Sequence, residues 1–122
     1  MGTNLPANSY RDENTDELMR AMRTLRDVDE CYRLFEDLCT IAEIREMSKR
    51  LLAASMLSEN CIYTRITEET GLSTATISRV NRCLKYGEDG YKTVLSRLAE
   101  QRKQSEPAKA SKKTGTGEGK DE

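Results

Sequence analysis

Apolar residues recur along the chain at the three- and four-residue spacing of helices, and no segment of useful length alternates apolar and polar residues as a strand does. This pattern predicts an all-α protein of about six helices. The first of these helices is expected to begin at Thr15, with Asp16 and Glu17 in its first turn, where acids suit the positive end of a helix dipole. Further helices are expected over residues 28–39, 40–58 and 91–102, with a pair of shorter helices over 62–85.

The helix expected over 40–58 has the clearest start in the chain and an unusual second half. Thr40 precedes an apolar-periodic run and Glu43 follows three residues later, which is the pattern of a capping box. Residues 51–57, with the sequence LLAASML, are apolar nearly all the way round the helix. Such a helix must be buried on more than one side. In so small a protein, a second subunit is the natural source of that cover.

The two ends of the chain are polar, and each contains a proline. Neither end has enough apolar surface to offset the entropy lost on ordering. The sequence therefore predicts a flexible arm over 1–14, a helical domain over 15–102 and a disordered polar tail over 103–122. The remaining core is thin for a monomer, which again indicates oligomerisation.

The most informative stretch, residues 62–85, has the pattern of a helix-turn-helix. Gly71 lies where the chain must leave the first helix with a positive φ, a conformation that glycine adopts without steric cost. Leu72 fills the gap between the two helices, and Ser73 caps the second helix. The buried inner faces of the pair are expected to consist of Ile66, Ile77 and Val80.

The outer face of the second helix favours DNA as the ligand. Its first turn has short polar or small residues that allow close approach to base edges, and basic residues follow that can reach phosphates. No acidic residue occurs between Ser73 and Tyr86, whereas an ordinary helix hairpin would show Glu–Lys pairs on such a surface. The predicted DNA-binding residues on this helix are Ser73, Thr74, Ala75, Ser78, Arg79, Arg82 and Lys85.

Composition excludes several other functions. The chain has no histidine, and its four cysteines form no Cys-x-x-Cys pair, so neither a metal site nor a cofactor is expected. Nothing indicates a catalytic nucleophile with a base beside it, so an enzyme is not expected. A signal peptide and a membrane-spanning run are both missing, which favours the cytoplasm. The net charge of −1 argues against indiscriminate nucleic-acid binding but leaves room for a local basic face.

Two alternatives remain open at the level of sequence. Cys61 or Cys83 could make the protein a thiol or redox sensor, because Cys83 follows Arg79 and Arg82, whose positive charges would favour a thiolate. The helix-turn-helix could also serve as a docking surface for another protein. The absence of a salt-dependent affinity for DNA would favour that alternative.

The block from Gly71 to Lys85, the following Tyr86-Gly-Glu-Asp-Gly-Tyr91 and the block 40–50 resemble the Trp repressor superfamily, most closely its bacterial YerC/YecD-type branch. The resemblance covers about residues 15–100. It implies an intertwined homodimer of six-helix chains that acts as a transcriptional repressor. As in the Trp repressor itself, two recognition helices would enter successive major grooves of a pseudo-palindromic operator. Base-edge positions of the family fall on Thr74, Ala75 and Ser78, and its phosphate-contact positions fall near Tyr63, Thr64, Thr67 and Lys85.

The same resemblance raises the question of a ligand pocket. Arg50 and Arg79 match the two arginines that sandwich an indole in the Trp repressor, and Thr40 and Thr76 match further pocket positions. However, Val80 replaces a glycine that leaves room for the ring, and Cys83 replaces a serine that helps to bind the amino group. We therefore expect that tryptophan is not the effector, which leaves an unidentified small molecule or none. Arg50 and Arg79 could instead contact phosphate or form an ion pair with Glu43 or Glu46.

Overall fold

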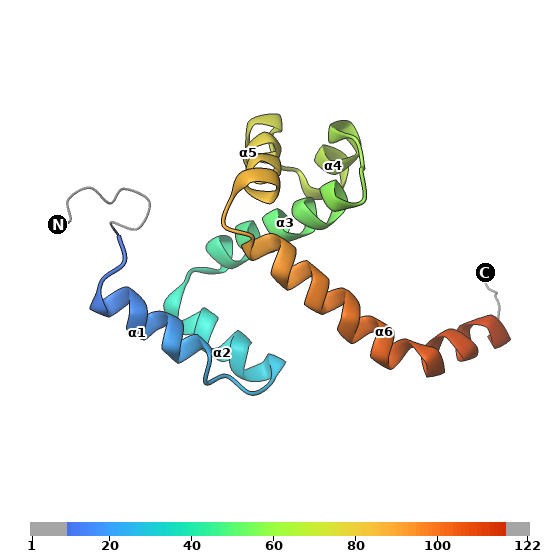
Figure 1. Cartoon of the computed structure of the whole chain (residues 1–122), viewed down its shortest axis with the longest axis horizontal. Coiled ribbons are helices and arrows are strands. Elements are labelled where there is room, and N and C mark those ends of the chain that lie inside the picture. Colours follow the sequence, from blue (N-terminus) through green and yellow to red (C-terminus); the bar gives the residue numbers. More distant parts are fainter. Residues whose placement is uncertain (1–9, 117–122) are drawn as a thin grey trace. The chain divides into compact units, whose positions relative to one another are not determined.

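The computed structural model describes the backbone of residues 10–116 and the side-chain burial of residues 10–105 (Figure 1). Within this range the chain forms helices and no strands, which confirms the expected all-α class. The helices are α1 (Glu13–Met22), α2 (Val28–Leu38), α3 (Ile41–Ser58), α4 (Tyr63–Thr70), α5 (Thr74–Tyr86) and α6 (Gly90–Thr116).

The chain divides into two compact units within α3, one ending at Arg45 and the other beginning at Glu46. The first unit holds α1, α2 and the first turn of α3. None of the residues of α1 or α2 is buried in the single chain. The second unit holds the rest of α3 together with α4, α5 and α6, and it contains the buried core.

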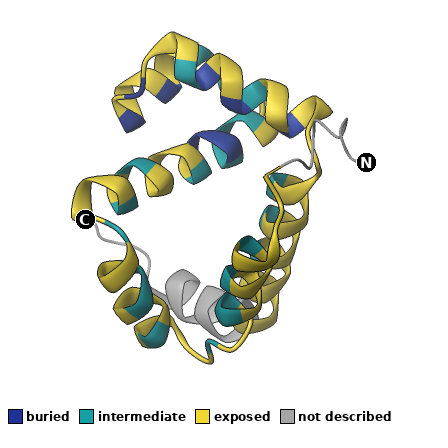
Figure 2. Ribbon diagram, turned by 90° about the vertical axis from the view of Figure 1, so that its left-hand side faces the viewer, coloured by how far each residue is buried: buried dark blue, intermediate teal, exposed yellow. Residues whose placement is uncertain are grey.

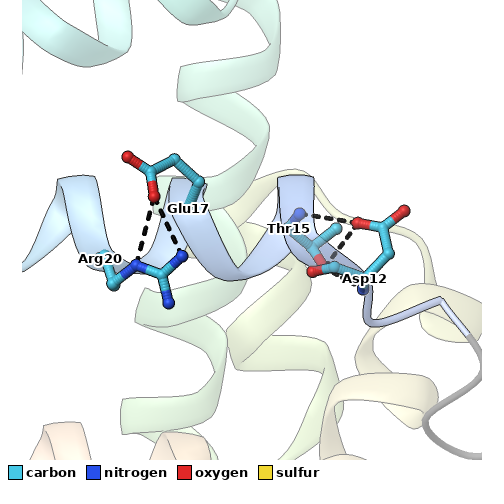
Figure 3. Close-up of polar contacts among 4 residues, drawn as sticks. All are labelled: Asp12, Thr15, Glu17 and Arg20. Carbon is cyan, nitrogen blue, oxygen red and sulfur yellow. Dashed lines mark hydrogen bonds and ion pairs between the residues drawn. The ribbon is translucent and has the colours of Figure 1, made fainter.

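Helix α1 begins earlier than the sequence suggested. The expected start at Thr15 is wrong, because Asp12 caps the helix and α1 begins at Glu13. The backbone N–H of Thr15 donates to Asp12 Oδ1 at 2.8 Å, and the N–H of Asp12 donates to Thr15 Oγ1 at 2.8 Å (Figure 3). Thr15 is thus the third helical residue of a capping box. The hydrogen bond from the backbone N–H of Thr15 lowers the pKa of Asp12 below its usual value, and the hydrogen bond from the Thr15 hydroxyl lowers it further.

The starts of α2 and α3 agree with the sequence. The Asp27 side chain caps α2, accepting a hydrogen bond from the backbone N–H of Glu30. At α3, the N–H of Thr40 donates to Glu43 Oε1 at 2.8 Å, and the N–H of Glu43 donates to Thr40 Oγ1 at 3.1 Å. The capping box expected at this position is therefore confirmed.

Helix α6 is longer than expected. The apolar pattern predicts an end near residue 102, whereas α6 continues to Thr116, so residues 103–116 have a helical backbone. Residues 99–105, AEQRKQS, are all exposed, and most of them are strong helix formers. Helix propensity therefore accounts for the continuation of α6 through residues 99–105, beyond the part whose apolar face is half-buried. Most of the predicted arm, residues 1–9, and the last part of the predicted tail, 117–122, lie outside the described residues.

The core of the second unit lies between α3, α4 and α5 (Figure 2). Tyr91 and Leu95 of α6 pack against it. Among residues 51–57 of α3, only Ala53 and Ala54 are buried, while Leu52 is 45% exposed. One chain therefore covers only one side of this apolar helix. The buried apolar residues are Ala53, Ala54, Ile66, Leu72, Ile77, Val80 and Leu84.

Candidate nucleic-acid interface

The turn between α4 and α5 has the geometry that the sequence predicts. Gly71 adopts a φ of 75°, in the left-handed region, and its N–H donates to the carbonyl oxygen of Thr67 at 2.8 Å. Leu72, which follows, is 5% exposed and belongs to the core. A left-handed glycine and a buried leucine together fix the direction in which the chain leaves α4.

Thr70 stabilises the same turn, and the sequence interpretation missed it. It is the buried polar residue of this region, at 5% exposure. Its hydroxyl donates to the carbonyl oxygen of Ile66 at 2.8 Å and accepts from the N–H of Leu72 at 3.1 Å. A threonine in the last turn of a helix, directly before a glycine, is a signal for such a side-chain-to-backbone bond.

Helix α5 is anchored at its start and along one face. Ser73 caps it, as expected, by accepting a hydrogen bond from the N–H of Thr76 at 3.1 Å. Ile77 and Val80, at 0% and 3% exposure, bury the inner face together with Leu84. Because these side chains fix the rotation of α5 about its axis, they also determine which residues face outward.

The outward residues of α5 are those expected for contact with DNA. Thr74, Ala75 and Ser78 are exposed near its start, and Arg79, Arg82 and Lys85 are exposed farther along. Within the described part of the chain, none of these three cations takes part in an ion pair. Their charges are therefore available to phosphates.

Helix α4 brings a second set of polar residues to the start of α5. Tyr63 is half-buried, Thr64 and Thr67 are exposed, and all three line a concavity of about 450 Å³ together with Glu68 and Thr74. Ile62 precedes α4 and provides no side-chain cap, so the first backbone N–H groups of α4 have no such acceptor. The first turns of α4 and α5 thus form one polar surface.

This arrangement belongs to a known family. The Trp repressor protein family matches the chain over residues 13–99, which include every helix up to the packed part of α6. The chain belongs to the Trp repressor family. The resemblance noted in the sequence is therefore confirmed.

The chain is also similar to three individual proteins. An uncharacterised protein, YerC of Bacillus subtilis strain 168, is 51% identical over 90 residues, which cover 74% of this chain and 86% of YerC. The crystal structure of a candidate Trp repressor from Staphylococcus aureus superposes on this chain with a TM-score of 0.73 at 43% sequence identity. The match covers 79% of this chain and 96% of the Staphylococcus aureus chain. A TrpR-like protein from Eubacterium eligens ATCC 27750 gives a TM-score of 0.72 at 50% identity, with coverages of 75% and 95%.

Several residues that match the ligand pocket of the Trp repressor make contacts within this chain. Arg50 forms an ion pair with Glu46, at 3.6 Å between Nε and Oε2, which was one alternative to a ligand contact. Thr76 is half-buried and bonded to Ser73, and Cys83 is exposed. Thr40 belongs to the first unit and caps α3. Val80, at the position where the Trp repressor itself has glycine, is buried in the core.

All four cysteines are free thiols; Cys61 is half-buried and Cys83 is exposed. Cys83 lines an apolar groove of about 560 Å³ with Leu51, Tyr91 and Val94. Among the described residues, no group of three or more His, Cys, Asp or Glu side chains is placed to hold a metal ion. Across those same residues, no helix is long and apolar enough to cross a membrane.

Proposed function

We propose that this protein is a sequence-specific, double-stranded DNA-binding regulator that represses transcription by occupying its operator. The observation that carries the proposal is the outer face of α5. This face presents three unpaired cations and short polar side chains, and no acid occurs in the helix, while its inner face is locked into the core. An enzymatic role is not proposed, since family members are regulators rather than enzymes.

In the proposed complex, α5 enters the major groove. Thr74, Ala75 and Ser78 meet base edges, while Arg79, Arg82 and Lys85 contact phosphates. The uncapped N–H groups at the start of α4 add further phosphate contacts, together with the hydroxyl groups of Tyr63, Thr64 and Thr67, because a helix N-terminus attracts anions.

The proposal is tested by selecting bound sequences from random duplex DNA with the purified protein. We expect a pseudo-palindromic motif, because a two-fold dimer presents two equivalent recognition helices. Transcription from a promoter that contains the motif should fall when the protein is added. Binding that shows no sequence preference and no salt dependence would favour the alternative of a protein-docking surface.

A thiol-sensing role has one observation in its favour, the exposure of Cys83 on the recognition helix itself. Oxidation of this thiol would change the surface of α5 close to Arg79 and Arg82. DNA affinity measured before and after mild oxidation, with Cys83→Ser as the control, separates this role from simple repression.

We propose that the regulator is a homodimer that does not fold as a stable monomer. Large apolar side chains are exposed on several helices of the single chain, and one face of α3 lacks a partner. An apolar groove also runs along Leu51 and Val94. Apolar side chains that lie together on a surface, as they do in this groove, indicate an interaction site. The exposed residues include Met19, Val28, Tyr32, Leu38, Ile41, Met47, Leu52 and Val94.

Sedimentation should therefore show a dimer at micromolar concentration, and the midpoint of thermal unfolding should rise with protein concentration. Leu52→Glu should weaken the dimer, because the substitution would place a charge on the uncovered side of α3. A compact, cooperatively unfolding monomer at micromolar concentration would contradict this proposal.

Tryptophan is not proposed as the effector. Val80 occupies a position where the Trp repressor has glycine, and it is 3% exposed. Extra methyl groups in a packed site are poorly tolerated by a stacked ring. We expect millimolar tryptophan to change neither the unfolding midpoint nor the DNA affinity, since a ligand that binds the folded state must raise the midpoint.

Val80→Gly provides the complementary measurement. The unfolding midpoint of this variant should be lower than that of the wild type. If Val80 fills the space of the indole ring, indole compounds should raise the midpoint of the variant. A rise in the wild-type midpoint with tryptophan, accompanied by tighter DNA binding, would show that Val80 does not close the site.

A further inference from the structure

Glu68 is an acidic residue on a surface otherwise suited to DNA. It is exposed on α4 and, within the described part of the chain, forms no ion pair. Its neighbour Glu69 is different, because Arg65 pairs with it at 3.5 Å between Nε and Oε2. Of the two adjacent acids, only Glu68 keeps its carboxylate available to a ligand.

The position of Glu68 is defined by the concavity of about 450 Å³ at the junction of α4 and α5. Glu68 lines this concavity together with Thr74, the first residue of α5. If α5 reads the major groove, as proposed above, Thr74 meets a base edge, and the concavity is filled by the adjacent part of the DNA. The carboxylate of Glu68, which lines the same concavity, then faces the part of the DNA next to the base that Thr74 meets.

The chemistry of a carboxylate limits what it can contact there. Phosphates and the acceptor atoms of guanine would repel the carboxylate. They also offer no hydrogen-bond donor that could offset the free energy of removing it from water. Cytosine presents only the donor amino group at N4 in the major groove, whereas adenine presents its amino group next to the acceptor N7. Cytosine is therefore the base that a carboxylate matches best.

We propose that Glu68 is a specificity-determining residue that accepts a hydrogen bond from the amino group of a cytosine next to the base met by Thr74. The proposal rests on the proposed function. It assigns the reading of one base in each half-site to α4 rather than to α5. No other α4 residue in the concavity carries a charge, since Tyr63, Thr64 and Thr67 are neutral.

The test repeats the DNA selection with Glu68→Gln and Glu68→Ala. Glutamine can donate as well as accept and pairs well with adenine N6 and N7, so the glutamine variant should change one position of each half-site from cytosine towards adenine. The alanine variant should lose preference at that position. The expected loss of discrimination at that base is roughly fivefold per half-site, the low end for a base-edge contact. Glu69→Gln is the matched control, because it makes the same change of charge at the adjacent residue and should leave the motif unchanged.

Two results would overturn the inference while leaving the proposed function intact. If the Glu68 variants selected the wild-type motif but bound every DNA sequence more tightly, Glu68 would merely repel phosphates. An unchanged motif with unchanged affinity would mean that Glu68 does not approach the DNA. A wild-type protein that selected no motif would be a different failure, because it would contradict the proposed function as well.

Discussion

Replacing Arg79, Arg82 and Lys85 together by glutamine should remove most of the salt dependence of DNA binding. Each cation that neutralises a phosphate releases a counterion, and the logarithm of affinity falls with the logarithm of salt concentration in proportion to the number of such contacts. With these three cations on both subunits of the proposed dimer, the expected slope is roughly −5, which lowers affinity about 10³-fold between 50 and 200 mM salt. The variant should bind weakly at low salt and show a slope close to zero. Affinities measured by fluorescence anisotropy over a salt series provide the test.

Single substitutions separate phosphate contact from base reading on the same helix. Arg82→Ala should weaken binding to all sequences alike, whereas Thr74→Ala or Ser78→Ala should change the selected motif. Arg97→Gln, which removes an exposed charge from α6, is the control for net charge and should have little effect. If the Thr74 and Ser78 variants kept the wild-type motif, the assignment of the reading face would be wrong.

Much of the fold could be predicted from short-range signals. The capping box at Thr40 and Glu43, the left-handed Gly71 and the cap at Ser73 each depend on residues at most four positions apart, so the sequence contains all the needed information. The inner face of α5 also follows from periodicity, because Ile77 and Val80 have the spacing of one helix face.

The sequence was less informative where a boundary depends on competition between equivalent signals. Asp12 and Thr15 are both good capping residues, and the structure uses both, with Asp12 as the cap and Thr15 as its reciprocal partner. The end of α6 was missed for another reason. Periodicity detects only a buried face, whereas residues 99–105 continue the helix with exposed side chains, most of which are strong helix formers.

The candidate site was predicted in part. The outward residues of α5 follow from its inner face, but the approach of α4 to the start of α5 depends on the angle set by the turn. Glu68 therefore received no role from the sequence, since its nearness to Thr74 arises only in the folded unit. Thr70 was overlooked because its hydroxyl satisfies the backbone at the turn, a function that polarity alone does not reveal.

Ile77→Ala should cause a large loss of stability and, with it, the loss of DNA binding. Ile77 is fully buried at the centre of the α5 inner face. Truncating such a side chain costs about 2–5 kcal/mol, because the lost burial adds to the cost of the cavity left behind. The core that remains is small, so this cost is a large part of the roughly 5–15 kcal/mol that stabilises an ordinary domain. Urea unfolding at a fixed protein concentration, followed by circular dichroism, provides the measurement.

Ile62→Ala is the matched control for this prediction. Ile62 precedes α4 and is 69% exposed, so the same truncation should change the free energy of unfolding by less than about 0.5 kcal/mol. Apparent DNA affinity of the Ile77 variant should fall in parallel with the folded fraction, because only the folded chain presents α5 to the DNA. Equal stabilities of the two variants would show that Ile77 does not anchor the recognition helix, and the orientation assigned to Thr74, Ser78 and Arg82 would lose its physical basis.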